Sequence, residues 1–221
     1  MKFSTRTLDI LKNFSTINSG IVVKQGSRLR TMSAQKNILA EANVDETFPV
    51  DFAIYDLTSL IGLLSMNKDE AEIDFDTNQL TIRGYGGRSR TSYRFTSKEL
   101  VISPPDKDLV LPTEDAKFTL SADDFNHLQK VASVLQSPQM IVQAESGKLY
   151  MHTVDLQNDS ANTMRLEIGD TDASDFRVVL RTENMKLMPA TYNVTVTLKG
   201  FTRFESADGR MRYWISTEAT A

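Results

Sequence analysis

The chain contains no cysteine among its 221 residues, which excludes a disulfide scaffold, a thiolate metal site and a cysteine nucleophile. Histidine is nearly as scarce, and neither His127 nor His152 has a second histidine at metal-ligand spacing. No apolar run approaches the roughly 18 residues that cross a bilayer, and the first residues lack the apolar core of a signal peptide. We therefore expect a cytoplasmic protein that needs no metal or cofactor.

Motifs for catalysis are also missing. Asp123 and Asp124 are adjacent, but neighbours on a helix point about 100° apart, and carboxylates in a first helical turn are explained by the helix dipole. The glycine-rich run at 84–87 is not followed by a helix or by the lysine of a phosphate-binding loop. It reads as a hairpin tip, and stacking of its neighbouring arginines and tyrosines on single-stranded nucleic acid is the alternative. We predict a protein that is not an enzyme; a small hydrolase acting through Asp123 or Asp124 is the competing hypothesis.

The charge balance argues against a generic nucleic-acid coat. Lysine and arginine total 25 and aspartate and glutamate 29, a net charge of −4. Residues 1–110 carry 14 charges of each sign, whereas residues 111–221 carry 11 basic and 15 acidic groups. A negative total does not forbid contact with DNA, because the local field depends on where the charges lie.

The same order of elements occurs twice, on either side of a proline-containing stretch at 102–108. In the first half Ser4 is placed to cap a helix running to about Asn18, and a hairpin is predicted over 21–32. In the second half Ser121 is placed to cap a helix running to about Gln136, and a hairpin is predicted over 139–153. A short acidic loop is expected at 169–174.

The later parts of the two halves also correspond. Asp56 precedes a short apolar helical pattern, and Thr182 precedes another that contains Met185 and Met188; alternating strands follow each. The sequence thus predicts an α+β fold of two similar domains, each with two helices on antiparallel sheets. The predicted domains are residues 1–108 and 109–221, with a connector at about 102–112.

The polar sides of the predicted helices are modestly basic. The first helix offers Arg6 and Lys12 there, the third offers His127 and Lys130, and Lys68 and Lys186 lie at the short helices. For any one of these side chains, an ordinary solvated charge is the simpler explanation. Only the four faces taken together indicate a shared surface.

Several short motifs in the sequence point to a family. In chain order they are Ile10-Leu11-Lys12-Asn13-Phe14-Ser15-Thr16-Ile17-Asn18-Ser19-Gly20, Ala53-Ile54-Tyr55-Asp56-Leu57, Leu63-Leu64-Ser65 and Asn184-Met185-Lys186. With the internal repeat, this pattern resembles the sliding clamps of T-even-type tailed phages, which are DNA polymerase processivity factors. The resemblance extends from Lys2 to about Ile215.

The resemblance implies a ring-shaped homotrimer that encircles duplex DNA without sequence specificity and tethers the replicative DNA polymerase. Twelve helices, each about 10 Å wide, would line a hole roughly 28 Å across. A clamp loader would be a further partner, and the ring would act in the cytoplasm of the infected bacterial host. The alternative is a viral structural or assembly protein whose oligomer never encloses DNA.

The resemblance also implies three groups of site residues. The expected DNA-facing residues are Arg6, Lys12, Lys68, His127, Lys130 and Lys186. The expected walls of a pocket for a partner peptide are Leu109, Leu111 and Pro112 of the connector with Tyr213, Trp214 and Ile215 of the last strand. The expected subunit interface joins Tyr93 and Phe95 of one copy to Met164 and Leu166 of the next.

Overall fold

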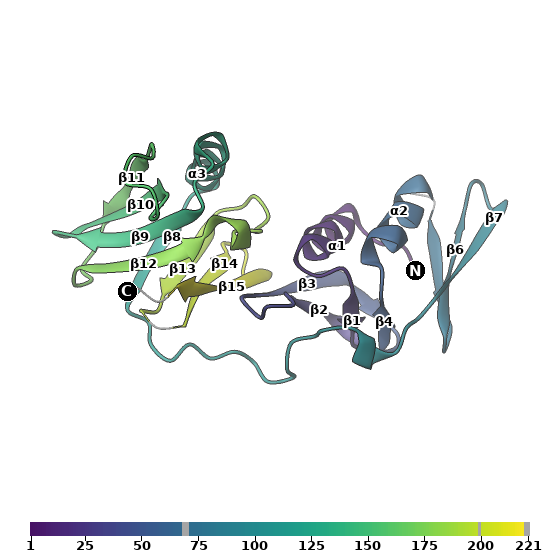
Figure 1. Cartoon of the computed structure of the whole chain (residues 1–221). Coiled ribbons are helices and arrows are strands. Elements are labelled where there is room, and N and C mark those ends of the chain that lie inside the picture. Colours follow the sequence, from purple (N-terminus) through teal and green to yellow (C-terminus); the bar gives the residue numbers. More distant parts are fainter. Residues whose placement is uncertain (68–70, 199, 219–221) are drawn as a thin grey trace. The chain divides into compact units, whose positions relative to one another are not determined.

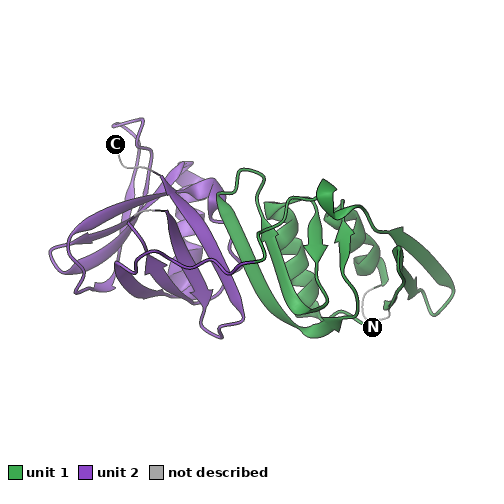
Figure 2. Cartoon of the chain, turned by 90° about the horizontal axis from the view of Figure 1, so that it is seen from below, with its two compact units in different colours: residues 1–106 green, residues 107–221 purple. Residues whose placement is uncertain are grey.

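The computed structural model describes residues 1–67, 71–198 and 200–218. The chain divides into two compact units, residues 1–106 and 107–221, which Figure 2 shows in different colours. This division lies two residues before the predicted boundary at Asp108. Each unit combines antiparallel strands with helices, so the predicted α+β class is confirmed.

Unit 1 begins with the predicted helix, and its second helix follows a short strand as expected, but the long strand β3 (Ile38–Phe48) was not predicted. Figure 1 shows its two α-helices side by side over the same strands, and the two helices are in contact. The elements are α1 (Thr5–Ile17), β1 (Ile21–Val23), β2 (Gly26–Met32), β3 (Ile38–Phe48), β4 (Phe52–Ile54), α2 (Leu57–Asn67), β5 (Glu72–Phe75), β6 (Gln79–Gly84), β7 (Ser89–Arg94) and the 3-10 helix η2 (Lys98–Leu100).

Helix α1 forms where the sequence provides both a cap and an apolar stripe. The Ser4 hydroxyl accepts a hydrogen bond from the Thr7 backbone N–H at 3.2 Å, as the predicted N-cap requires. Ile10 and Phe14 are fully buried, and helical spacing of three and four residues puts such side chains on one face. The core beneath also contains a group of phenylalanines, among which Phe52 stacks on Phe95 with ring centroids 5.0 Å apart.

The described strands of unit 2 pair in the antiparallel order β11-β10-β9-β12-β15-β14-β13-β8. Helix α3 (Ala122–Leu135) of this unit lies on one face of the sheet that they form (Figure 1). The strands are β8 (Ala116–Leu120), β9 (Gln139–Glu145), β10 (Lys148–Val154), β11 (Met164–Asp170), β12 (Phe176–Arg181), β13 (Tyr192–Val196), β14 (Phe201–Ser206) and β15 (Met211–Glu218), and the 3-10 helix η3 covers Thr182–Asn184.

The predicted start of α3 and the hairpin after it are confirmed. The Ser121 hydroxyl accepts the Asp124 backbone N–H at 3.0 Å. Strands β9 and β10 pair through a two-residue turn whose residues Ser146 and Gly147 have φ angles of 52° and 78°, the signature of the tight turns that suit twisted hairpins. Phe125 of α3 packs edge-on against Tyr192, with ring centroids 6.0 Å apart, and so joins the helix to the sheet.

The prediction of a second helix in this unit is wrong. Residues 182–184 form a single 3-10 turn, and the segment carrying Met185 and Met188 is irregular. Met188 precedes a proline, a position that disfavours helical backbone angles. Side chains also bind the backbone groups that a helix would use: Tyr192 donates its hydroxyl to the Met188 carbonyl, and Gln129 donates its amide to the Met185 carbonyl at 2.7 Å.

Two strand predictions also need correction. Strands β1 and β2 do not form a hairpin, because β1 pairs with β4 and β2 pairs with the longer β3. The connection between them is instead held by the Gln25 backbone N–H, which donates to Asp51 at 2.8 Å. The loop expected at 169–174 begins later, since β11 continues through Gly169 and Asp170 in register with β10. Within the described part of the chain, we find no helix that is long and apolar enough to cross a membrane.

Candidate functional site

The solvent-facing side of α1 carries one basic residue of the two that were predicted to act there. Lys12 is exposed and forms an ion pair with Asp9 at 3.2 Å, and Thr16 is exposed beside it. Arg6 lies six residues from Lys12, which places the two about 120° apart around the helix. Arg6 is half-buried, with its Nε atom inaccessible. The structure therefore does not bring Arg6 and Lys12 onto one exposed face.

The exposed side of α3 holds both residues predicted for it. His127 and Lys130 are exposed, and three residues of separation put them about 60° apart on the same face. Asp123 and Val134 share this face and are exposed as well. Asp123 lies in the first turn, where a carboxylate compensates the helix dipole.

Lys186 lies beside α3 although it does not belong to a helix. The Gln129 side chain of α3 donates to the Met185 carbonyl, so the residue before Lys186 is fixed to the helix. Lys186 is exposed. Gln129 holds the backbone at Met185 in place. The sequence did not reveal this role, because the two residues are 56 positions apart and no local pattern indicates the contact. The remaining predicted residue, Lys68, lies outside the described residues.

The helix faces are closer to neutral than the sequence suggested. Helix α2 exposes Thr58, Ser59, Gly62, Ser65 and Met66, none of which is charged. On α1 and α3 the exposed lysines are accompanied by Asp9 and Asp123. A surface with so few unbalanced cations gives weak, salt-sensitive attraction to phosphates and no firm grip on any one of them.

Each unit has an edge strand whose outer side pairs with no other described strand. Strand β7 is the outer strand of the sheet β5-β6-β7, and β11 is the outer strand of the larger sheet in unit 2. Tyr93 donates its hydroxyl to the Asp56 carbonyl at 2.7 Å, and Phe95 stacks on Phe52, so both predicted interface residues are anchored within unit 1. Met164 and Leu166 of β11 are half-buried on one side of their strand. The free N–H and C=O groups of such edges pair readily with another strand.

Half of the predicted peptide pocket is incorrect. Tyr213 and Ile215 are fully buried and Trp214 is 4% exposed, so these three side chains belong to the core of unit 2. Tyr213 packs edge-on against Tyr192, with ring centroids 6.2 Å apart, and burial raises the pKa of both phenols. The physical reason is that β15 lies in the interior of the sheet, between β12 and β14, and both of its faces are covered.

The connector half differs. Leu109 and Leu111 are half-buried, while Pro112 is exposed and Val110 is 83% exposed. Leu109, Val110 and Leu111 are thus three consecutive apolar residues that are at least partly exposed, and a contiguous exposed apolar stretch marks a candidate docking site.

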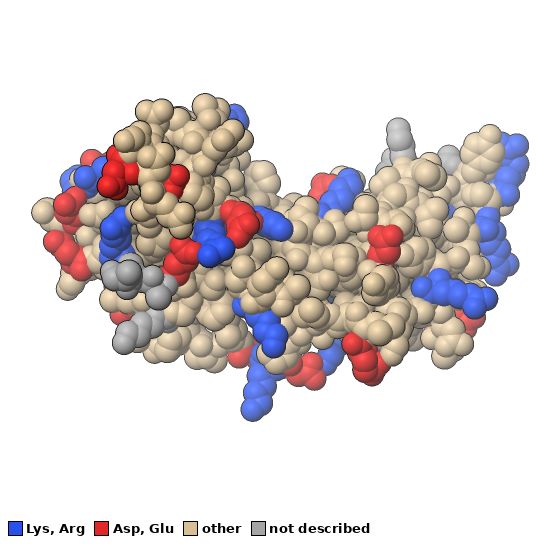
Figure 3. Space-filling model, viewed as in Figure 1, with Lys and Arg blue, Asp and Glu red and all other residues tan. Residues whose placement is uncertain are grey.

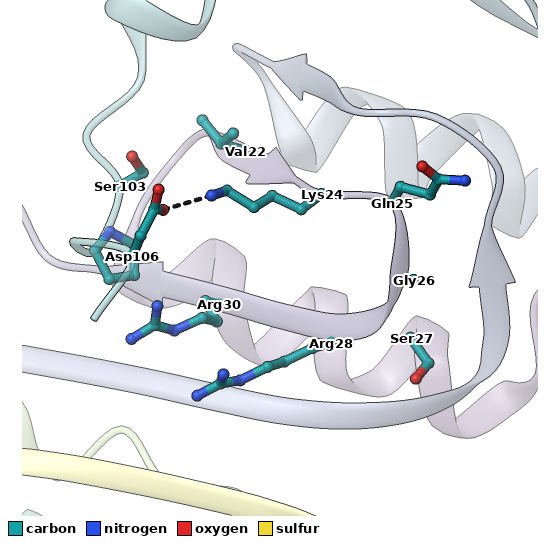
Figure 4. Close-up of a pocket in the computed structure, with 10 residues that line it drawn as sticks. Val22, Lys24, Gln25, Gly26, Ser27, Arg28, Arg30, Ser103 and Asp106 are labelled. Atoms are coloured by element: carbon teal, nitrogen blue, oxygen red, sulfur yellow. Dashed lines mark hydrogen bonds and ion pairs between the residues drawn. The ribbon is translucent and has the colours of Figure 1, made fainter. Parts of the chain in front are cut away.

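A separate cavity of about 380 Å³ lies in unit 1 where the connector begins (Figure 4). Its walls are β2 and the stretch around Ser103 and Asp106, and it is lined by Lys24, Arg28 and Arg30. Lys24 forms an ion pair with Asp106, which Figure 4 marks by a dashed line, and Arg30 donates to the Pro105 carbonyl at 2.8 Å. The ion pair and the hydrogen bond therefore hold the start of the connector against β2 and the residues just before it.

The described residues contain no cluster of three or more histidines, cysteines or acidic groups that could hold a metal ion. His152 is half-buried, and its burial, followed by the charge of Arg165, lowers its pKa. This keeps the imidazole neutral at pH 7, and the adjacent Tyr150 ring lies 6.3 Å away between centroids.

Comparison with known proteins gives a consistent result for both halves of the chain. Residues 2–102 match the family model described as DNA polymerase processivity factor. Residues 117–219 match a second family model, described as the C-terminal part of the gp45 sliding clamp.

Curated relatives of similar length carry one common name. The chain is 31% identical over 225 residues to a protein of Vibrio phage KVP40 named sliding clamp, covering 99% of this chain and 100% of that one. It is 32% identical over 204 residues to the sliding clamp of Enterobacteria phage T4, covering 90% and 89% of the two chains. Among solved structures, A. fulgidus PCNA with the C-terminal region of FEN-1 bound has a TM-score of 0.74 at 11% identity, covering 100% of this chain and 98% of that one. At that identity the match describes the fold alone.

Proposed function

This chain belongs to the sliding-clamp family of phage DNA polymerase processivity factors, and we propose that three copies join head to tail into a ring around duplex DNA. The observation that carries the proposal is the presence of an unpaired edge strand in each unit, β7 in unit 1 and β11 in unit 2. Two different edge strands on separate units of one chain support a heterologous contact between copies. Such contacts close into a ring when the rotation from one copy to the next adds up to a full turn.

The nearly neutral helix faces suit a protein that encloses the duplex DNA along which it moves. A closed ring retains DNA by topology, so the attraction to phosphates can stay weak and movement along the duplex costs little free energy. Lys12, His127, Lys130 and Lys186 are the side chains we propose to face the duplex, without preference for sequence. Arg6 is a weaker candidate because it is half-buried.

The corrected helix count changes the geometry of the hole. If only the three α-helices that the structure describes in each chain lined it, nine helices about 10 Å wide would leave an opening of roughly 19 Å, too narrow for a hydrated duplex. The segment that follows η3 must then fill a fourth position beside α3, and the hydrogen bond from Gln129 to Met185 holds it there. This makes Lys186 a lining residue although no helix carries it.

Polymerase tethering follows from the same family membership. A tether keeps the enzyme near the primer end at a high effective concentration. We propose that partners, the clamp loader included, dock an apolar peptide against the connector at Leu109, Val110 and Leu111, in the cytoplasm of the infected host. The exposure of Val110 supports this site. Replacing Val110, which is exposed, by serine should weaken polymerase binding and leave the melting temperature unchanged.

The ring is tested by retention on DNA. The assembly should have a mass near three times 24.8 kDa in native mass spectrometry, stay on circular DNA, and leave it once the circle is cut. An assembly that binds linear and circular DNA equally, or never reaches the trimer mass, would refute the ring and favour the structural or assembly role.

The DNA-facing residues are tested by charge reversal. Lys12→Glu with Lys130→Glu should reduce DNA retention and processive synthesis while the trimer persists. Lys36→Glu with Lys107→Glu is the matched control, because it changes the net charge equally at a turn and in the connector. Equal losses in both double variants would show that the helix faces have no special part.

A further inference from the structure

The turn between β6 and β7 is exposed and carries a basic side chain. Tyr85, Gly86 and Gly87 have φ angles of 52°, 63° and 79°, so the turn is built from left-handed residues. The Tyr85 ring is 66% exposed, and the Arg88 guanidinium lies 4.3 Å from its centroid, a cation–π contact that orders both side chains. We call Tyr85 to Arg88 the basic tip.

The positive charge continues along the edge behind the basic tip. Arg90 and Arg94 are exposed on β7, and Arg83 is exposed on β6 with Asp74 at 2.7 Å. Figure 3 shows basic side chains gathered over the β6–β7 end of unit 1, with few acidic ones among them. Such an edge favours a partner that carries negative charge.

An acidic cavity lies in unit 2 where β8 begins and β11 ends. It measures about 520 Å³ and is lined by residues 114–117, at the start of β8, and by residues 170–173, from the last residue of β11 onward. Four of these are carboxylates, Glu114, Asp115, Asp170 and Asp172, against one lysine, Lys117. We call this group the acidic cavity.

Cations within unit 2 balance part of this charge. Lys148 lies 2.7 Å from Asp170, and Glu114 pairs with Lys117 and lies 3.7 Å from Arg203. Asp115 accepts the Thr113 hydroxyl at 2.6 Å and the Leu198 backbone N–H at 2.9 Å. Asp172 is exposed at the rim. The lining therefore remains negative, and Asp172 is the carboxylate that a visiting cation reaches most easily.

Strand direction connects the two features. Every strand pair of both edge sheets is antiparallel. If β7 of one copy also adds to β11 of the next in antiparallel fashion, the start of β7 lies beside the end of β11. Aligning the strand centres puts Ser89 near Asp170, and the residues just before Ser89 are the basic tip. The residues just after Asp170 line the acidic cavity.

We propose that the basic tip of one copy docks at the acidic cavity of the next copy and acts as an electrostatic latch on each subunit contact. The proposal rests on the ring proposed above. The latch fixes the register of the two edge strands, because a slip by two residues carries Arg88 away from Asp172. It also makes ring closure more sensitive to salt than backbone pairing alone would be, since exposed charges are screened within about 8–10 Å.

The test is a charge swap measured on the full chain. Arg88→Glu and Asp172→Arg should each weaken trimer formation by about tenfold in native mass spectrometry or analytical ultracentrifugation at low salt. The double variant, which restores opposite charges across each contact, should return to within about threefold of the wild type. The loss should shrink as salt is raised. Both residues lie on exposed turns, and a melting curve for each variant separates misfolding from dissociation.

Two matched controls decide the direction of pairing. Lys36→Glu reverses a basic residue at another exposed turn of unit 1, and Asp159→Arg reverses an acidic residue at the opposite end of β11. Neither should affect the trimer under the proposal. An effect of Asp159→Arg with none of Asp172→Arg would show parallel pairing and overturn the latch. Intact trimers in both Arg88→Glu and Asp172→Arg would also overturn it, while the ring stands; a wild type that never forms trimers overturns the ring itself.

Discussion

Glu46 of β3 is expected to hold the start of α1 in place. Its two carboxylate oxygens accept the Ser4 backbone N–H and the Thr7 hydroxyl, and the side chain is half-buried. Ser4 is also the N-cap of α1, so Glu46 ties the capped end of the helix to a strand 42 residues away. Replacing Glu46 by glutamine removes the charge and puts amide hydrogens where an acceptor is needed.

The size of the loss can be worked from these contacts. A hydrogen bond to a charged group contributes about 1.5–3 kcal/mol, and a carboxylate near a helix N-terminus adds about 0.3–1 kcal/mol. Partial exposure weakens both, and glutamine keeps one acceptor oxygen. We expect Glu46→Gln to lower the free energy of unfolding by about 2 kcal/mol at pH 7.

The loss should depend on pH in a defined direction. Burial raises the pKa of Glu46, but the hydrogen bonds from Ser4 and Thr7 together lower it by more than burial raises it. The folded-state pKa therefore lies below the ordinary 4.5. A depressed folded-state pKa means that the stabilisation is fully present above the unfolded-state pKa and is lost as the pH falls through the folded value. The difference between wild type and Glu46→Gln should therefore be largest near neutral pH and shrink below about pH 4.

Urea unfolding followed by circular dichroism at pH 7, 5 and 3 measures this difference. Glu72→Gln is the control, because that glutamate has the same chemistry but is exposed on β5. A Glu46→Gln protein as stable as wild type at pH 7 would refute the argument. So would a difference that stays constant down to pH 3.

Three further predictions concern packing. Gly20→Ala should lower the free energy of unfolding by about 1–3 kcal/mol in urea, because its Cβ would lie 2.8 Å from the Ile54 carbonyl oxygen. Gly62→Ala, on the open side of α2, should instead raise it by about 0.5–1 kcal/mol, and a loss there would contradict the exposed helical setting. Tyr192→Phe leaves the Met188 carbonyl without its buried donor, so we expect a loss of about 1–3 kcal/mol and faster hydrogen exchange around Met185; unchanged exchange would show that the hydroxyl does not hold this segment.

Local patterns predicted most of the elements because each signal lies within a few residues. Ser4, Asp56 and Ser121 were identified as helix caps from their position before an apolar stripe, and all three accept a backbone hydrogen bond from the first turn. The hairpin at Ser146 and Gly147 was likewise readable from its turn residues.

The errors share a cause: in each, a pairing that forms only in the folded chain outcompeted a local tendency. The helix expected after Thr182 is lost to Tyr192 and Gln129, whose side chains take the backbone carbonyls that a helix would use. The hairpin expected at 21–32 is lost because β3 offers β2 a longer ladder. Tyr213 and Ile215 resembled a pocket wall in the sequence, yet β15 is an interior strand, and only the sheet order reveals that.

The sequence by itself determined the α+β class, the near repeat of elements and the family, because these depend on residue types in order along the chain. The tertiary structure alone decided which charges meet. Only folding brings Glu114 beside Asp172, or fixes Lys186 next to α3 through Gln129. The physical reason is that electrostatic and hydrogen-bonding partners are selected by their distance in space. The sheet of unit 2 brings the start of β8 close to the end of β11, and no local sequence pattern encodes that distance.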